Sequence, residues 1–498
     1  MDQAAGGEAA LPAHARQRRR LVLAASVMAT FMAAVESTIV ATAMPTIVAD
    51  LGGFSLFSWV FAAYLLAMAV TIPLYGRLAD IYGRKRVFFA GTGIFLAGTS
   101  LCGFASTMGM LVLFRAIQGL GAGAIQPIAS TVVGDIYTPA ERARVQGLIS
   151  SVFGVSAIVG PALGAFIVEH LHWSLVFWVN LPIGAASIVM YRLFLHERVE
   201  PKSHRVDYLG SILLAVGVGA AMLVLVQAGR LGPAAIGGLA AFAAAALCGL
   251  IVQERRAAEP IVPFRLWRLR VIALANLGTF GTGASMMAVS AFLPAYVQGV
   301  MGQSAGVAGA VLGCQSVSWT LATFAAARVM IRTSYRVSAV MGGTALLLGG
   351  AMLALLRPDS SIFWAAAGSL VMGVGMGFCN PSFLVSIQAS VGWGERGVAT
   401  GGVMFMRMMG QSLGAAVFGA VVNFGIAARA PGAGDAVNRL MEPALRAGLG
   451  AAEIARLSAA VAASVHEIYL LVLVIAVATL VVALSFPKGL SPTRGRQG

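Results

Sequence analysis

The stretch GRLADIYGRKRV, Gly76 to Val87, decides the fold. A long apolar segment ends there, and a lone acid, Asp80, precedes three consecutive cations at 84–86 before the next apolar segment begins. Two apolar segments joined by a short basic connection are typical of membrane helices with a cytoplasmic loop between them. Gly76 and Gly83 suit close helix approach and a tight turn.

The composition extends this reading to the whole chain of 498 residues. Hydrophobic residues make up 59% and charged residues only 11%, whereas about 25% is usual for a soluble protein. Apolar segments of membrane-spanning length recur throughout and predict about fourteen helices, an all-α polytopic membrane protein. These segments fall near 21–48, 55–75, 87–105, 109–134, 145–168, 174–194, 208–228, 233–252, 271–299, 305–327, 337–356, 362–387, 399–425 and 466–486.

The distribution of basic residues explains the net charge of +15. In a soluble chain this charge would suggest a nucleic-acid partner. Most of the 34 Lys and Arg residues instead lie on one side of the predicted helices, together with the N-terminal tail. The positive-inside rule then predicts a multi-pass protein of the cell (inner) membrane with both termini in the cytoplasm. Anionic lipid accounts for the basic character, and we expect no nucleic-acid partner.

The chain also repeats itself. GAGAIQPIASTVVGDIYTPAERARVQG in the first half matches GMGFCNPSFLVSIQASVGWGERGVATGG in the second. Two related six-helix halves are typical of transporters whose substrate site lies between the halves at mid-membrane. The segments near 208–228 and 233–252 have no counterpart and are interpreted as an inserted pair.

This organisation predicts five parts. We expect a cytoplasmic tail at 1–20, an N-terminal six-helix bundle at 21–199, an inserted helix pair at 200–257, a C-terminal six-helix bundle at 258–487 with an outer loop at 426–464, and a second cytoplasmic tail at 488–498.

Four motifs in this order resemble those of the major facilitator superfamily and, within it, the fourteen-helix drug:proton antiporters. GRLADIYGRKRV resembles the family's loop motif, and RAIQGLGAGA its fourth-helix motif. GVSAIVGPALGA resembles the antiporter motif of the fifth helix, and AAVESTIVATAMPTI the first-helix motif. The resemblance implies the major facilitator fold, with two pseudo-symmetric six-helix bundles plus two inserted helices. One departure is Glu36, where members of this branch often carry Asp.

Four polar residues within the spans are candidates for proton coupling and substrate binding: Glu36, Arg115, Gln118 and Arg407. Glu36 is the only acid deep in any predicted span, and a carboxylate there is costly unless it is paired, protonated or hydrated. The alternative is a protonated acid that only bonds a neighbouring helix. Arg115 needs Gln118 or a carboxylate nearby, or else serves a structural role. For Arg407, functional and packing roles remain equally open.

Two further groups are candidates for conformational roles. The first is a charge network that holds the cytoplasmic side closed, against the alternative of an ordinary basic loop. Its expected members are Gly76, Asp80, Gly83, Arg84, Asp135 and Arg142. The second is the antiporter motif, a pliable and closely packed helix. Its members are Gly154, Gly160, Pro161 and Gly164.

These observations predict a proton-coupled multidrug efflux transporter that exports hydrophobic compounds, lipophilic cations among the candidates, by alternating access. Its partners would be small lipophilic molecules, protons and the lipid bilayer, with any periplasmic adaptor unidentified. The proton gradient replaces a cofactor, and no metal spacing or nucleophile–base set suggests an enzyme. Alternatives are a dedicated exporter of an endogenous metabolite or toxin and, from another class, a membrane sensor.

Overall fold

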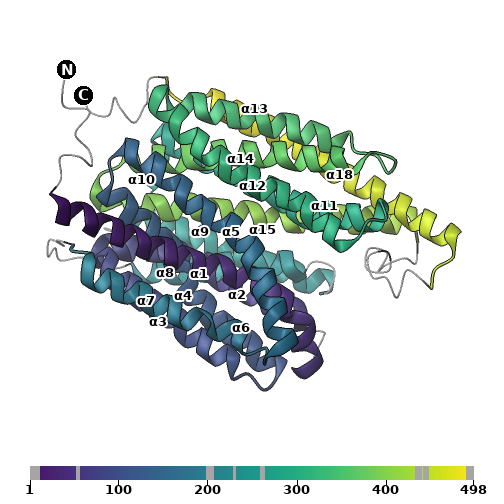
Figure 1. Ribbon diagram of the computed structural model, residues 1–498, viewed down its shortest axis with the longest axis horizontal. Helices are drawn as coiled ribbons and strands as arrows, with labels where there is room; N and C mark the ends of the chain where they lie inside the picture. Colours follow the sequence, from purple (N-terminus) through teal and green to yellow (C-terminus); the bar gives the residue numbers. More distant parts are fainter. Residues whose placement is uncertain are drawn as a thin grey trace. The chain divides into compact units, whose positions relative to one another are not determined.

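The computed structural model describes residues 12–51, 56–197, 207–227, 231–257, 264–431, 440 and 448–488, and its regular elements are all helices (Figure 1). They are α1 (Ala13–Leu51), α2 (Phe57–Tyr82), α3 (Arg84–Gly103), α4 (Met108–Ile136), α5 (Pro139–His170), α6 (Leu175–Trp178), α7 (Asn180–Phe194), α8 (Tyr208–Gln227), α9 (Pro233–Arg256), α10 (Phe264–Trp267), α11 (Arg270–Ala295), the π-helical turn η2 (Tyr296–Val300), α12 (Ala305–Arg332), α13 (Tyr335–Ala354), α14 (Ile362–Ser390), the 3-10 turn η3 (Trp393–Glu395), α15 (Arg396–Arg429) and α18 (Ala451–Leu484).

Twelve helical segments in this described part are long and apolar enough to cross a membrane, by length and composition. Two further helices, α5 and α8, contain 32 and 20 residues. The last helix, α18, begins at Ala451, well before the apolar segment near 466–486. Residues 1–11 and 489–498 of the two expected tails, and parts of the expected connections near 200, 260 and 440, lie outside the described residues. The expected tail at 1–20 is too long, because α1 already begins at Ala13.

The stretch Gly76–Val87 is almost entirely helical. Helix α2 continues to Tyr82 and α3 begins at Arg84, so Gly83 alone separates them. The short basic loop expected between the segments 55–75 and 87–105 is therefore wrong in its extent, because the cations belong to the first turn of α3. Gly83 has φ 91° and ψ 150°, a left-handed conformation that glycine adopts without the steric cost of a Cβ atom.

The helices form two compact units. Unit 1 comprises Met1–Ala273, Leu384–Phe405 and Pro492–Gly498, and unit 2 comprises Leu274–Phe383 and Met406–Ser491. The end of α14 and the start of α15 thus belong to unit 1, although most of both helices belongs to unit 2.

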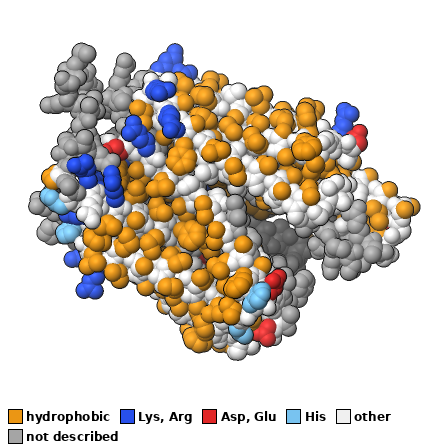
Figure 2. Space-filling view, viewed as in Figure 1, with side chains coloured by type: hydrophobic (Ala, Val, Ile, Leu, Met, Phe, Trp, Pro, Cys, Tyr) orange, Lys and Arg blue, Asp and Glu red, His pale blue; other side chains and the backbone are white. Residues whose placement is uncertain are grey.

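In unit 1, α2 and α3 pack against α4, and α1 packs against α5 and α7. The inserted helices α8 and α9 pack against each other, and α8 also contacts α2. Apolar side chains cover much of the face in Figure 2, while Lys and Arg gather at the end of unit 1 where α1 begins. This separation is what membrane helices with a basic end require.

In unit 2, α13 packs along α18, and α12 contacts α13 and η2. Helices α11 and α15 approach so closely that a Cβ atom on Gly283 would lie 2.3 Å from the carbonyl oxygen of Arg407. Small residues permit this proximity, as is common where helices pack in lipid.

Candidate functional site

Glu36 of α1 lies at the centre of a buried polar cluster in unit 1, with none of its side chain exposed. One oxygen, Oε1, accepts hydrogen bonds from the Arg115 guanidinium of α4 and, at 3.0 Å, from Nε2 of Gln118. The other oxygen, Oε2, accepts from Nδ2 of Asn180 at 2.5 Å. Asn180 is the first residue of α7, so three helices converge on one carboxylate.

Arg115 is held on several sides, with only 1% of its side chain exposed. Its Nη1 also donates to Oε1 of Gln118 at 2.6 Å, and its Nε donates to the carbonyl oxygen of Val60 at 3.2 Å. Its guanidinium carbon lies 4.2 Å from the centre of the Tyr64 ring, a cation–π contact. Nε2 of Gln118 also donates to Oγ1 of Thr99 at 2.8 Å. We call this group the Glu36 cluster: Glu36, Tyr64, Thr99, Arg115, Gln118 and Asn180.

The Glu36 cluster is arranged for an ionised carboxylate, since the side chains of Arg115, Gln118 and Asn180 all donate hydrogen bonds to it. A proton on Oε2 would place two donors face to face unless the Asn180 amide turned over. Oδ1 of Asn180 is buried and has no hydrogen-bond partner among the described residues, so it is available to accept. The side chain of Asn180 can therefore serve either protonation state of Glu36.

A second cluster lies around the break between α2 and α3. Asp80, near the end of α2, accepts from the backbone N–H of Gly397 at 2.9 Å and of Val398 at 2.8 Å. These are N–H groups of the first turn of α15, which have no partner within their own helix. The carboxylate thus caps α15 and meets the positive end of its dipole.

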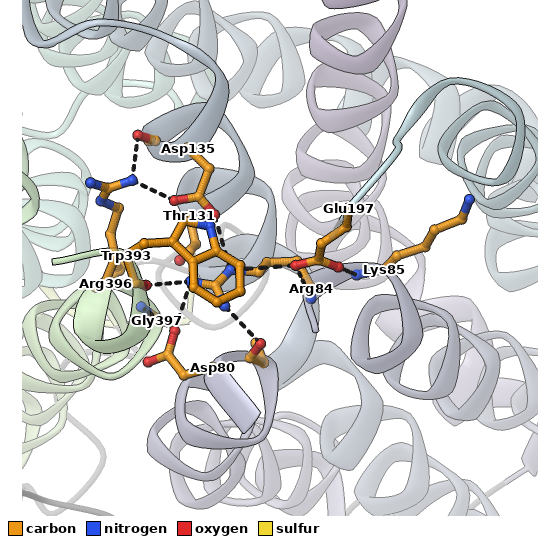
Figure 3. Close-up of polar contacts among 12 residues, drawn as sticks. Asp80, Arg84, Lys85, Thr131, Asp135, Glu197, Trp393, Arg396 and Gly397 are labelled. Carbon is orange, nitrogen blue, oxygen red and sulfur yellow. Dashed lines mark hydrogen bonds and ion pairs between the residues drawn. The ribbon is translucent and has the colours of Figure 1, made fainter. Parts of the chain in front are cut away.

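Arg84 joins the separate parts of this second cluster (Figure 3). It forms ion pairs with Asp80 at 2.8 Å and with Asp135, at the end of α4, at 2.9 Å. Its Nη2 donates to the carbonyl oxygen of Trp393 at 2.7 Å, and its guanidinium carbon lies 3.8 Å from the centre of that indole ring. Since its side chain is only 1% exposed, these contacts are shielded from solvent.

Two further side chains complete the cluster. Arg396 donates to Oδ1 of Asp135 at 2.5 Å and to the carbonyl oxygen of Gly134 at 3.0 Å. Glu197, after α7, accepts from the backbone N–H of Arg84 at 2.9 Å and so caps α3. We call the group the Arg84 cluster: Asp80, Arg84, Asp135, Glu197, Trp393 and Arg396.

The start of α5 is fixed beside this cluster by Glu141. Its carboxylate forms a capping box with Thr138 and an ion pair with Arg19 at 2.8 Å. Glu141 precedes the apolar segment 145–168. Burial raises its pKa, but the hydrogen bonds from Thr138 and Arg19 outweigh that effect, and the pKa is lowered overall.

The structure brings together most of the residues that the sequence proposed for the charge network. Gly76 belongs to the contact through its size, since a Cβ atom there would lie 2.7 Å from the carbonyl oxygen of Gly397. Arg142 differs from the others: its Nε donates to the carbonyl oxygen of Tyr137 at 2.8 Å, at the junction of α4 and α5.

The remaining candidates lie elsewhere. Arg407 belongs to unit 2, on α15, whereas the Glu36 cluster lies in unit 1. The antiporter-motif residues lie on α5, where a Cβ atom on Gly160 would be 1.9 Å from Oγ1 of Thr38, two residues after Glu36. Gly164 also faces α1, near Thr42, and Gly154 and Pro161 lie within the same helix.

Sequence reasoning missed several members of both clusters. Asn180 lies in the stretch HWSLVFWVNLPIG, where an Asn flanked by apolar residues at the start of a helix is a usable signal. Tyr64, Glu197 and Trp393 carry no such signal, because their partners are remote in sequence.

Comparisons with known proteins identify the family of the chain. Residues 27–415 match the family model described as Major Facilitator Superfamily. The chain is 33% identical over 408 residues to "Multidrug resistance protein 3" of Bacillus subtilis, covering 81% of this chain and 79% of that protein. It is also 33% identical over 411 residues to "Multidrug transporter protein MdtP" of the same organism, covering 82% and 76%.

A fungal relative and a solved structure extend the comparison. "Efflux pump FUS6" of Gibberella moniliformis is 33% identical over 431 residues, covering 83% of this chain and 76% of the pump. The human organic anion transporter MFSD10 (TETRAN) has a similar fold, with a TM-score of 0.62 at 14% sequence identity, covering 92% of this chain and 99% of that chain.

Proposed function

Because the chain belongs to the major facilitator superfamily, a family of transporters rather than enzymes, we propose that this multi-span membrane protein is a proton-coupled multidrug efflux transporter. Relatives named for multidrug resistance and multidrug transport, each about a third identical over most of the chain, support the substrate class. The observation that carries the coupling is the fully buried ion pair between Glu36 and Arg115.

We extend the proposal to the topology. Adding α5 and α8 to the twelve apolar helices gives fourteen spans, with α8 and α9 as the inserted pair between two six-helix bundles. For these parts we propose the boundaries expected from the sequence, except that α1 begins at Ala13. The concentration of basic residues near the start of α1 supports termini in the cytoplasm and an inner-membrane location.

The Glu36 cluster provides a mechanism for coupling. An ionised Glu36 holds Arg115 of α4 and Asn180 of α7 against α1. Protonation removes the charge that attracts the guanidinium, so the three helices lose a shared anchor. Arg115 itself stays protonated, since its pKa is above about 12. The proton therefore moves on and off Glu36, and Arg115 responds to it.

The antiporter-motif helix lies against the same part of α1. Because Gly160 allows α5 to approach Thr38 closely, a change in the position of α1 is transmitted directly to α5. We propose that substrate export and proton entry share this movement. Arg407 on α15 has no assigned step, and its candidate roles remain substrate contact or packing.

The Arg84 cluster acts as a latch in this proposal. Asp80 and Arg84 hold the first turn of α15, and Arg396 holds Asp135. All these contacts must break before the start of α15 can separate from the ends of α2 and α4. Such a cluster has discrete latched and unlatched arrangements, which alternating access requires.

Transport by purified protein tests the proposal. Proteoliposomes would be given an imposed pH gradient and a panel of uncharged, cationic and anionic lipophilic dyes. The proposal predicts gradient-driven movement of several dyes, abolished by Glu36→Gln while membrane insertion is retained. Movement of one metabolite alone would favour a dedicated exporter, and full transport by Glu36→Gln would refute the coupling role.

A further inference from the structure

Unit 2 contains an apolar cavity of about 650 Å³ between α12 and α14. Its wall includes Gly313, Cys314, Val317 and Leu321 of α12 and Leu370 and Phe378 of α14. Pockets that hold drug-sized molecules have volumes of roughly 300–1,000 Å³, so this one has the capacity for such a ligand. The two helices lie side by side in Figure 1.

The cavity offers a ligand very little polarity. Among the described residues that line it there is no Asp, Glu, Lys, Arg or His. The hydroxyl of Ser318 already donates to the carbonyl oxygen of Leu370 at 2.7 Å. The thiol of Cys314 is a weak hydrogen-bonding group. Contact with this wall would therefore be almost wholly apolar.

The described acids of unit 2 lie elsewhere. Asp359 lies between α13 and α14, Glu453 lies in the first turn of α18, and Glu467 forms an ion pair with Arg429. A lipophilic cation in the cavity would have no neighbouring carboxylate from the lining. An unpaired charge in such surroundings is costly, whereas an uncharged molecule carries no such penalty.

The buried acid of the Glu36 cluster is not free to pair with a cation. The buried carboxylate of Glu36 is already engaged by Arg115, Gln118 and Asn180. A cationic ligand would have to replace the guanidinium to reach it. The lining of the cavity therefore favours an uncharged ligand over a cationic one.

We propose that the cavity between α12 and α14 binds uncharged lipophilic molecules in preference to lipophilic cations. Its identification as a cargo site rests on the proposed export function. The preference narrows the substrate class, because the sequence alone left lipophilic cations among the candidates.

A matched pair of variants tests the cavity. Gly313 lines it and Gly309 does not, although both lie on α12 and a Cβ atom at either would meet open space. Gly313→Phe should place a ring in the cavity, while Gly309→Phe makes the same change one turn away. Binding of the uncharged dye N-phenyl-1-naphthylamine would be measured by fluorescence in nanodiscs. We expect at least about tenfold weaker binding for Gly313→Phe and parental binding for Gly309→Phe.

A thiol-protection measurement locates the ligand independently. In a Cys248→Ser background, Cys314 is the partly exposed thiol, since Cys102 and Cys379 are buried. N-phenyl-1-naphthylamine should slow the reaction of Cys314 with N-ethylmaleimide, and tetraphenylphosphonium at the same concentration should not. Absence of protection by the uncharged dye, equal protection by the cation, or equal dye binding by the two glycine variants would overturn the proposal.

Failure of the proposed export function and failure of the cavity assignment give different experimental results. If the protein shows this binding pattern but moves no compound in proteoliposomes, the proposed function is wrong while the ligand preference of the cavity stands. If the protein exports dyes but Gly313→Phe binds the uncharged dye as the parent does, the cavity assignment is wrong and the function stands.

Discussion

Replacing Asp80 by Asn tests the latch at its most connected acid. The parent carboxylate accepts from the N–H groups of Gly397 and Val398 and forms an ion pair with Arg84. Asn keeps one oxygen acceptor of the same shape but removes the charge. Arg84 also keeps its ion pair with Asp135. The loss is therefore smaller than that for a completely broken buried pair.

The size of the effect follows from these contacts. A hydrogen bond to a charged group contributes about 1.5–3 kcal/mol, and breaking a buried pair outright costs about 3–5 kcal/mol. In Asp80→Asn one of the two backbone N–H groups keeps an oxygen acceptor and the other faces the NH2 group, while Arg84 keeps its pair with Asp135. We therefore expect about 2 kcal/mol less stability for the latched arrangement. That corresponds to a shift of roughly 30-fold towards the unlatched one.

Hydrogen exchange measures this shift directly. The amides of Gly397 and Val398 are protected by Asp80, so a peptide spanning 396–400 should exchange roughly 30-fold faster in Asp80→Asn. Export should fall without loss of expression. Asp50→Asn is the matched control, because Asp50 accepts from Trp173 away from the Arg84 cluster and should leave this peptide unchanged. Unchanged exchange in correctly folded Asp80→Asn would refute the latch.

Two further predictions concern stability. Gly160→Ala places a Cβ atom 1.9 Å from Oγ1 of Thr38, so it should cost about 1–3 kcal/mol of stability and lower the melting temperature. Gly93→Ala is the control, because a Cβ atom there meets open space and should leave the melting temperature unchanged. Equal melting temperatures of the two variants would contradict the close contact. Because the folded-state pKa of Glu141 is lowered, its stabilisation should be present above the ordinary value of 4.5 and disappear as pH falls through the lowered pKa. The melting difference between the parent and Glu141→Gln should therefore shrink on acidification, and a difference that grew instead would contradict the capping role.

The helical architecture was accessible from the sequence because hydrophobic length alone identifies membrane helices. Helix ends were less accessible. The basic residues after Gly83 suggested a loop, yet they form the first turn of α3, since one glycine with positive φ suffices for the turn. Likewise α18 begins at Ala451, in a segment less apolar than the span that follows.

The clusters were only partly accessible for a similar reason. Glu36, Arg115 and Asp80 could be recognised because charges near or within apolar segments are rare. Their partners could not be assigned by spacing. Asp80 accepts hydrogen bonds from the backbone N–H groups of Gly397 and Val398. Almost every residue type has a backbone N–H group, so no side-chain pattern predicts this contact.

Proton release on substrate binding tests the central claim most directly. The protein in weakly buffered detergent solution would receive a dye that the parent exports, and the pH change would be recorded. The account predicts that the protonated parent releases protons on binding, and that Glu36→Gln binds the dye without releasing them. Equal proton release by the parent and Glu36→Gln would contradict the assignment of Glu36 as the coupling group.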